Sequence, residues 1–312
     1  MSTLRIYALG RPRVLWDGVP VDFPAQKARD LLYMLLLHAG ENLERDWIAE
    51  RLWPLRPPGR ARRCLSTALW RLRNSVEGST TPAQRGYIRS ERGTLTFDQR
   101  LSYWFDVEVF EEKASAGLQG PLAHDQTCGE ALREAVELYQ GELLEGCYDD
   151  WCLAERERLR LLLLRVLRRL QGHARLAGDF ELAIAYGERL LDLDSLQEDV
   201  HREVMRCHVD AGQPTRALEH FHRWRETLRS ELQVEPMRET WQLYRRICAE
   251  RAALPASQGQ GDSLSSLESA LTQFDRALVA LRRAQEALQA AAAEFGLSRD
   301  VSGVALGCPD RD

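Results

Sequence analysis

The sequence predicts a mainly α-helical protein whose few short β-strands are confined to its N-terminal third. Three patterns lead to this fold class. Short extended runs broken by turn residues occur only at 4–23 and 87–97. The segment 106–251 has helical spacing of its apolar residues throughout, with an internal repeat of 34 residues. A third region, 264–296, has a heptad pattern. At 312 residues the chain is long enough for about two domains.

The composition is that of an ordinary globular chain, with 44% hydrophobic and 29% charged residues. The longest uncharged apolar run is too short to span a bilayer. The N-terminus lacks a long apolar stretch followed by a cleavage site, so we expect a cytoplasmic protein. The seven cysteines are odd in number and contain no CxxC pair. This predicts reduced thiols rather than a disulfide framework or a zinc module.

Motifs for the common catalytic and cofactor sites are absent from the sequence. A Walker A loop needs glycine before its lysine, but the two lysines, Lys27 and Lys113, follow Gln26 and Glu112. The near pair His220 and His222 lies two residues apart on an expected helix, which points the two rings in different directions. We therefore expect no enzyme activity, no cofactor and no metal.

The charges divide unevenly along the chain. Residues 1–105 carry 17 Arg and Lys against 10 Asp and Glu, which gives a formal charge of +7, and the remainder carries −12. Residues 51–76 contain seven arginines and no acidic residue. A basic unit followed by an acidic one favours a nucleic-acid-binding domain joined to a protein-interaction domain. The alternative is that each block of charge is simply a solvated surface.

The first domain, residues 1–104, is expected to contain strands, three helices and a terminal hairpin. Asp17-Gly18 between apolar flanks predicts the first hairpin. A helix with apolar residues on one face follows and ends at Gly40, and a short second helix ends at Pro54. The third helix spans 60–76, and 87–97 forms two strands that turn near Glu91 to Gly93.

The third helix carries the candidate binding residues. Leu65, Leu69, Leu72 and Val76 recur at spacings of 4, 3 and 4, which predicts one buried stripe. The rest of the helix is rich in arginine and short polar residues, which suits the major groove of DNA. A solvated face held by salt bridges is the alternative, although the helix contains no acid of its own. The candidate DNA-binding residues are Arg60, Arg62, Arg63, Thr67, Trp70, Arg71, Arg73 and Asn74 on the helix, with Arg89 and Arg92 in the terminal hairpin as a wing.

The string LLYMLLLHAGENLERDWIAERLW at 31–53, with ALWRLR at 68–73, resembles the Streptomyces antibiotic regulatory proteins. The resemblance implies a winged helix-turn-helix domain with a supporting helix over 46–52 and a recognition helix over 60–76. It places Arg63, Thr67, Trp70, Arg71 and Arg73 at DNA-contacting positions. Trp70 departs from the small or basic residue usual there, and could either stack on sugar-phosphate or fill a gap between helices.

The second domain, residues 105–253, is expected to contain paired helices. Gly178 and Gly212, Ala183 and Ala217, and Leu190 and Trp224 are each 34 residues apart, which matches the tetratricopeptide period. Stacked helix pairs of this kind present grooves to peptides or proteins.

The strings YQGELLEGCYDDWCLAERERLR at 139–160 and ELQVEPMRETWQLY at 231–244 resemble the bacterial transcriptional activation domain of the same family, and FDVEVFEE at 105–112 looks like its entry. Ser195 and Gln233 depart from the family, which usually has Pro and Gly there. The resemblance implies contact with RNA polymerase.

The tail begins with a linker at 254–263, whose composition predicts flexibility. Apolar residues then alternate spacings of 3 and 4 over 264–296, and residues 297–312 end the chain. This pattern predicts a coiled coil and a homo-oligomer, with folding back onto the helical domain as the alternative. The expected oligomerisation residues are Leu267, Leu271, Phe274, Leu278, Leu281, Gln285 and Leu288.

Together these features predict a DNA-binding transcriptional regulator, more specifically an activator, whose partners are promoter DNA and RNA polymerase. Two alternatives stay open at this point. One is a helical-repeat scaffold that binds proteins only. The other is a regulator controlled by a small molecule held in the helical domain.

Overall fold

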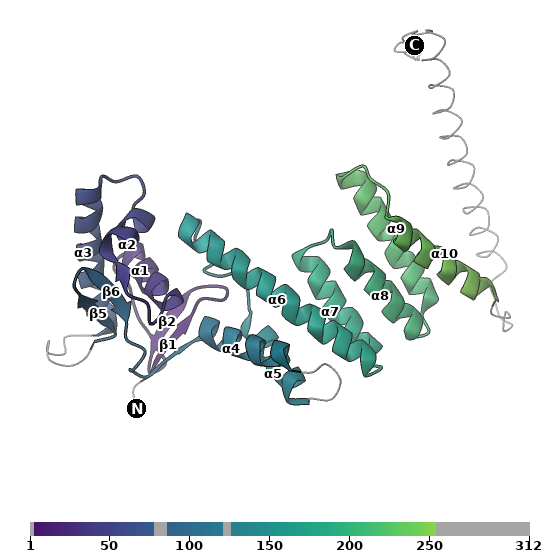
Figure 1. The fold of residues 1–312 in the computed structure, drawn as a ribbon, viewed down its shortest axis with the longest axis horizontal. Coiled ribbons are helices and arrows are strands. Elements are labelled where there is room, and N and C mark those ends of the chain that lie inside the picture. Colours follow the sequence, from purple (N-terminus) through teal and green to yellow (C-terminus); the bar gives the residue numbers. More distant parts are fainter. Residues whose placement is uncertain (1–2, 78–85, 121–125, 254–312) are drawn as a thin grey trace, which may run out of the picture. The chain divides into compact units, whose positions relative to one another are not determined.

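The computed structural model describes residues 3–77, 86–120 and 126–253, and Figure 1 shows the order of their elements. The N-terminal part contains β1 (Leu4–Tyr7), β2 (Arg13–Trp16), β3 (Val19–Pro20), α1 (Gln26–Leu37), β4 (Leu43–Glu44), α2 (Arg45–Leu52), α3 (Pro58–Val76), β5 (Ile88–Glu91), β6 (Thr94–Phe97) and β7 (Tyr103–Phe105). The helical part contains α4 (Asp106–Gln119), α5 (Gln126–Leu138), α6 (Asp150–Leu176), α7 (Phe180–Leu193), α8 (Glu198–Asp210), α9 (Pro214–Glu231) and α10 (Arg238–Ala253).

The first sheet has the strand order β3-β2-β1-β7. Asp17 and Gly18 form the predicted two-residue turn: both have positive φ, and Trp16 pairs with Val19 across them. Two positive φ angles define the turn that matches the twist of a hairpin. β7 pairs with β1 in parallel. The expected boundary between residues 104 and 105 therefore falls inside a strand of this sheet.

Three helices and a second sheet, with the order β4-β6-β5, complete the N-terminal part. The three predicted helices are present. α3 begins two residues earlier than expected, at Pro58, because proline fits the first turn of a helix, where its missing N–H costs nothing. The predicted terminal hairpin is also present, with Arg92-Gly93 as its turn. This order of elements is that of a winged helix-turn-helix.

The 34-residue repeat corresponds to the helix pairs α6–α7 and α8–α9. Gly178 and Gly212 lie in equivalent turns with φ of +79° and +72°, a left-handed conformation that favours glycine. Ala183 and Ala217 are both fully buried, so neighbouring helices approach closely at these two positions. The periodicity therefore identified both the turns and the contact points of the repeat.

One apolar core runs from β1 through the helices of the N-terminal part and into α8, since its buried members extend from Leu4 to Val204. A separate cluster fills the space between α8, α9 and α10 around Phe221 and Trp224. Residues 1–253 form one compact unit. The two expected domains thus share a continuous core rather than a loose connection.

Several expectations fall outside the described residues: the linker at 254–263, the heptad helix at 264–296 with its seven oligomerisation residues, and the end of the chain at 297–312. Among the helices that are described, none is long and apolar enough to cross a membrane.

Candidate nucleic-acid interface

The two faces of α3 differ sharply in burial. Its apolar stripe is inside the core, where the exposed fractions of Leu65, Leu69, Leu72 and Val76 are all 5% or less. The other face is exposed and consists of Arg60, Arg62, Arg63, Ser66, Thr67, Trp70 and Asn74, with Arg71 and Arg73 half-buried at its edge. The spacing of four apolar residues was enough to assign both faces, because the helix has a fixed period.

Four of the seven candidate arginines have no side-chain partner among the described residues. Three others are held by the protein. Arg62 forms two hydrogen bonds of 2.5 Å with Asp46 of α2, Arg73 donates to the carbonyl of Ile88 at 3.0 Å, and Arg89 lies 3.6 Å from the buried carboxylate of Asp98. The unpartnered guanidinium groups are those of Arg60, Arg63, Arg71 and Arg92.

The lack of acidic residues within α3 does not leave all of its arginines unpaired, because an acid on a neighbouring helix can reach them. Asp46 comes from α2 and pairs with Arg62, and the hydrogen bond from Arg62 lowers the pKa of Asp46. Arg62 would have to leave Asp46 to reach a phosphate or a base. It is therefore a weaker candidate for DNA contact than Arg63, one residue further along the same helix.

Trp70 lies on the surface, with 64% of the residue exposed. It does not fill a gap between helices, so that alternative is wrong. An exposed indole on the arginine-rich face presents a flat apolar surface beside Arg71 and Asn74. Such a ring can stack on a sugar or a base, as aromatic side chains do in single-stranded nucleic-acid sites.

The wing formed by β5 and β6 lies beside α3. Its turn residues Arg92 and Gly93 both have positive φ, +47° and +88°, and Glu91 pairs with Thr94 across them. Arg92 is exposed at the tip of the turn. Among the residues that the structure describes, Arg92 at the tip of the wing has no side-chain partner, and Arg89, nearer its base, is held by Asp98.

Arg45, the first residue of α2, connects the wing to α3, and sequence analysis missed this role. Its guanidinium donates to Ser66 of α3 at 3.1 Å and lies 3.5 Å from the hydroxyl of Ser90 in β5. Its backbone N–H also donates to the carbonyl of Gly93. No local pattern marks such a residue, because its partners are 21 and 45 positions away.

Asp106 joins the N-terminal part to the helical part. This side chain, only 2% exposed, accepts hydrogen bonds from the backbone N–H groups of Ala8 and Leu9 at 2.8–2.9 Å. Burial raises its pKa to about 6, although the backbone hydrogen bonds oppose that rise. It lies in a cavity of about 570 Å³.

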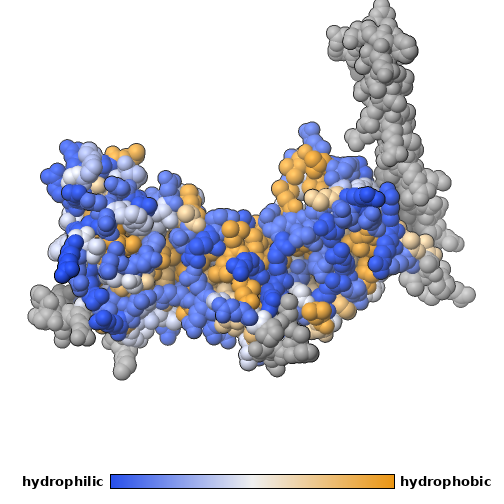
Figure 2. Space-filling view, viewed as in Figure 1, coloured by the Kyte–Doolittle hydropathy of each residue, from blue (hydrophilic) through white to orange (hydrophobic). Residues whose placement is uncertain are grey.

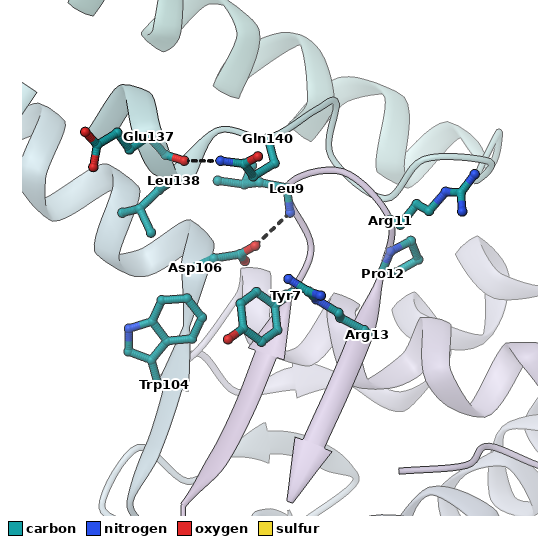
Figure 3. A pocket seen from close by; sticks show the side chains of 10 residues that line it. All are labelled: Tyr7, Leu9, Arg11, Pro12, Arg13, Trp104, Asp106, Glu137, Leu138 and Gln140. Atoms are coloured by element: carbon teal, nitrogen blue, oxygen red, sulfur yellow. Dashed lines mark hydrogen bonds between the residues drawn. The ribbon is translucent and has the colours of Figure 1, made fainter. Parts of the chain in front are cut away.

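Figure 3 shows the side chains around this cavity, which come from β1, β2, β7, α4 and α5 and from the loops that follow β1 and α5. Three of its polar groups already have partners. Asp106 accepts from Leu9, Gln140 donates to the Glu137 carbonyl, and the Arg13 guanidinium lies 4.3 Å from the centre of the Tyr7 ring. The cavity therefore belongs to the junction between the two parts, not to the interior of the helical part.

Metal ligands do not cluster in the part of the chain that the structure describes: no group of three or more His, Cys, Asp or Glu side chains is placed to hold an ion. His220 and His222 contact different partners. His220 lies 2.9 Å from His201, and His222 lies 3.5 Å from the Tyr244 hydroxyl.

The helical part matches the bacterial transcriptional activator domain over residues 105–248. The chain is 25% identical over 312 residues to the regulatory protein AfsR of Streptomyces coelicolor. This alignment covers 98% of this chain and 31% of that protein. It is also 25% identical to the transcriptional regulatory protein MoaR1 of Mycobacterium tuberculosis, over 79% of each chain, and to the regulatory protein DnrI of Streptomyces peucetius, over 75% of this chain and 88% of that one.

Among solved structures, EmbR of Mycobacterium tuberculosis, in complex with a low-affinity phosphopeptide, has a similar fold. The TM-score is 0.65 at 18% identity, with 88% of this chain and 72% of that chain covered. The similarity supports the winged helix followed by helix pairs. The chain spans about a third of AfsR, so AfsR has a large portion with no counterpart here.

Proposed function

We propose that the chain is a transcriptional regulator of the Streptomyces antibiotic regulatory protein type, and that it activates transcription by binding promoter DNA through α3 and the wing. The cytoplasm, where the DNA lies, is its place of action. The observation that carries this proposal is the composition of the exposed face of α3. It combines arginines that have no side-chain partner in the described part of the chain with Thr67, Trp70 and Asn74, and no acidic residue lies in the helix.

Arg63 and Arg71 are the proposed base-reading residues, since arginine can donate two hydrogen bonds to a guanine edge. Arg60 and Arg92 lie at the start of the helix and at the tip of the wing. They would contact the phosphates of the flanking backbone, where a positive charge binds without sequence preference. Arg62, Arg73 and Arg89 would position the helix and the wing through their bonds to Asp46, Ile88 and Asp98.

The test measures binding of full-length protein to its own promoter fragment by fluorescence anisotropy at several salt concentrations. Arg63→Ala and Arg71→Ala should each weaken specific binding by about 1–3 kcal/mol. Arg92→Ala should weaken binding to all sequences and reduce the salt slope by about one. Arg100→Ala is the matched control, because it removes the same charge beyond the far end of β6, away from the wing turn.

Equal affinity of wild type, Arg63→Ala and Arg71→Ala would refute the proposed role of α3. A protein that gives no salt-sensitive complex with any genomic fragment would instead be a scaffold that binds only proteins.

The helical part is the proposed contact for RNA polymerase, as its match to a transcriptional activator domain suggests. Exposed apolar side chains that a protein partner could cover include Leu153, Leu161 and Leu176 on α6, and Figure 2 shows hydrophobic patches on the visible face of this part. Transcription in vitro from the bound promoter tests the contact. Leu161→Glu should reduce activation but leave DNA binding unchanged, whereas unchanged activation would remove this surface from the contact.

Self-association through residues 264–296 is proposed on the heptad pattern alone. Burying an apolar seam against a second copy removes it from water. Deleting residues 262–312 should lower the mass measured by light scattering and weaken binding to DNA with two half-sites, but not to a single half-site. The same mass with and without these residues would refute the coiled coil, and a lower unfolding temperature of the helical part would then favour folding back.

A further inference from the structure

Cys147 and Cys152 form a pair at the start of α6. Cys147 lies in the segment that precedes the helix, and Cys152 lies in its first turn. The two thiols are close enough for each to shift the pKa of the other, and the Cys152 thiol donates to the carbonyl of Leu143 at 3.8 Å. Both are free thiols, Cys152 fully buried and Cys147 9% exposed. Gly146 and Tyr148 on either side of Cys147 are exposed, so this short segment lies at the surface.

Arg156 fixes the geometry of this pair. It lies one helical turn after Cys152, and its guanidinium donates to the carbonyl oxygens of Leu143, Leu144 and Cys147 at 2.8–3.1 Å. The same group lies 3.9 Å from the sulfur of Cys152. One cation therefore holds the backbone of Cys147 against the helix of Cys152, next to the sulfur of Cys152.

We propose that Cys147 and Cys152 are a modification site at which hydroperoxides, such as hydrogen peroxide, convert two thiols into a disulfide. The Cys147 thiolate attacks one peroxide oxygen, the O–O bond breaks, and water leaves after protonation, which gives a sulfenic acid. The Cys152 sulfur then attacks the sulfur of Cys147. The S–O bond breaks, a second water leaves, and the Cys152 proton is lost with it. Two thiols and one hydrogen peroxide thus yield one disulfide and two waters.

The environment assigns the attacking role to Cys147. The interaction with the Cys152 thiol lowers the pKa of Cys147, and the same interaction, together with burial, raises the pKa of Cys152. Only the thiolate form of a cysteine is an effective nucleophile. Cys147 is also the more exposed of the two, so a small oxidant reaches it first. Cys207 lacks these features, since burial raises the pKa of its thiol to about 11.

The site lies where the segment between α5 and α6 contacts the N-terminal part. The N–H groups of Leu144 and Glu145 donate to the carbonyls of Ala8 and Gly10, and Asp149 forms an ion pair with Lys27 of α1. A disulfide between Cys147 and Cys152 would therefore form beside the contacts that attach the DNA-binding part to the helical part.

Mass spectrometry of the full-length protein tests the proposal directly. No Lys or Arg lies between Arg133 and Arg156, so trypsin releases both cysteines in one peptide, 134–156. Folded protein is treated with hydrogen peroxide, its remaining thiols are blocked with N-ethylmaleimide, and the masses of the tryptic peptides are measured. We expect this peptide to lose two hydrogens and take up no N-ethylmaleimide, and dithiothreitol to reverse the change. At pH 7 it should react about tenfold faster than the Cys207 peptide.

Two variants separate the roles of the thiols, with circular dichroism to check folding. In Cys152→Ser, Cys147 should stop at a sulfenic acid that dimedone traps. In Cys147→Ser, Cys152 should stay a thiol. A wild-type peptide 134–156 that takes up two N-ethylmaleimide groups after oxidation would overturn the proposal, and that measurement requires no variant. Oxidation of Cys152 at the wild-type rate in Cys147→Ser would overturn the assignment of the attacking thiol.

Discussion

Two glycines of the helical part allow the packing between its helices to be measured. Gly187 lies in α7, buried against α6 and α8, and a Cβ added there would lie 2.4 Å from Cγ2 of Val204 and 2.5 Å from Nε2 of Gln171. These distances are about 1 Å shorter than ordinary van der Waals contact. Gly172 lies in α6, where an added Cβ would meet no described heavy atom within 4 Å outside its own helix turn.

Replacing either glycine by alanine gains about 1 kcal/mol of helix propensity. At Gly187 the added methyl also forces Val204 and Gln171 apart, and overpacking of this kind costs about 1–3 kcal/mol. Gly172→Ala should therefore raise the free energy of unfolding by up to about 1 kcal/mol. The free energy of unfolding of Gly187→Ala should be about 1–3 kcal/mol lower than that of Gly172→Ala, because the gain in helix propensity is common to both variants.

Urea unfolding followed by far-UV circular dichroism measures both free energies. A stabilising Gly187→Ala, equal to Gly172→Ala, would show that α6, α7 and α8 have room for a methyl group. The close approach inferred for the helix pairs would then be wrong.

Two further predictions concern the helical part. Gln233 has φ +56°, so Gln233→Gly should raise the free energy of unfolding by about 0.5–1 kcal/mol, and a lower urea midpoint would contradict this. Burial lowers the pKa of His220 to about 3, from 6.5 when exposed, so the unfolded chain binds a proton there that the folded chain does not. As pH falls from 6.5 towards 4, the free energy of unfolding of wild type should therefore fall by about 1 kcal/mol per pH unit relative to that of His220→Gln. Plots of this free energy against pH that run parallel for the two proteins would refute this.

The protonation state of the histidine pair follows from the structure. His201 Nε2 lies 2.9 Å from the carbonyl of Ser195, so it carries the proton that it donates. The other nitrogen, Nδ1, is then an acceptor, and His220 Nε2 donates to it. Neutral rings fit this arrangement. Protonation of His220 at Nδ1 would leave this hydrogen bond in place, so the physical basis of the expected acid sensitivity is the burial of a charge beside His201.

The sequence alone determined the features that depend on local geometry. The spacing of Leu65, Leu69, Leu72 and Val76 assigned the buried and exposed faces of α3, because a helix repeats every 3.6 residues. Asp17-Gly18 gave the first hairpin, because few residue pairs adopt two positive φ angles. The repeat of 34 residues identified the turns at Gly178 and Gly212, because both turns need a left-handed conformation that favours glycine.

Only the tertiary structure decided which arginines are available for DNA. Arg62 and Arg63 are adjacent residues of the same type, yet Arg62 is bound to Asp46 of α2, and the guanidinium of Arg63 has no side-chain partner among the described residues. Arg45 reaches α3 and the wing, and Asp106 bonds to N–H groups of residues nearly one hundred positions earlier. Ion pairs and hydrogen bonds act over a few ångströms in space, whatever the distance along the chain. Their partners are therefore fixed only when packing of the core brings distant segments together.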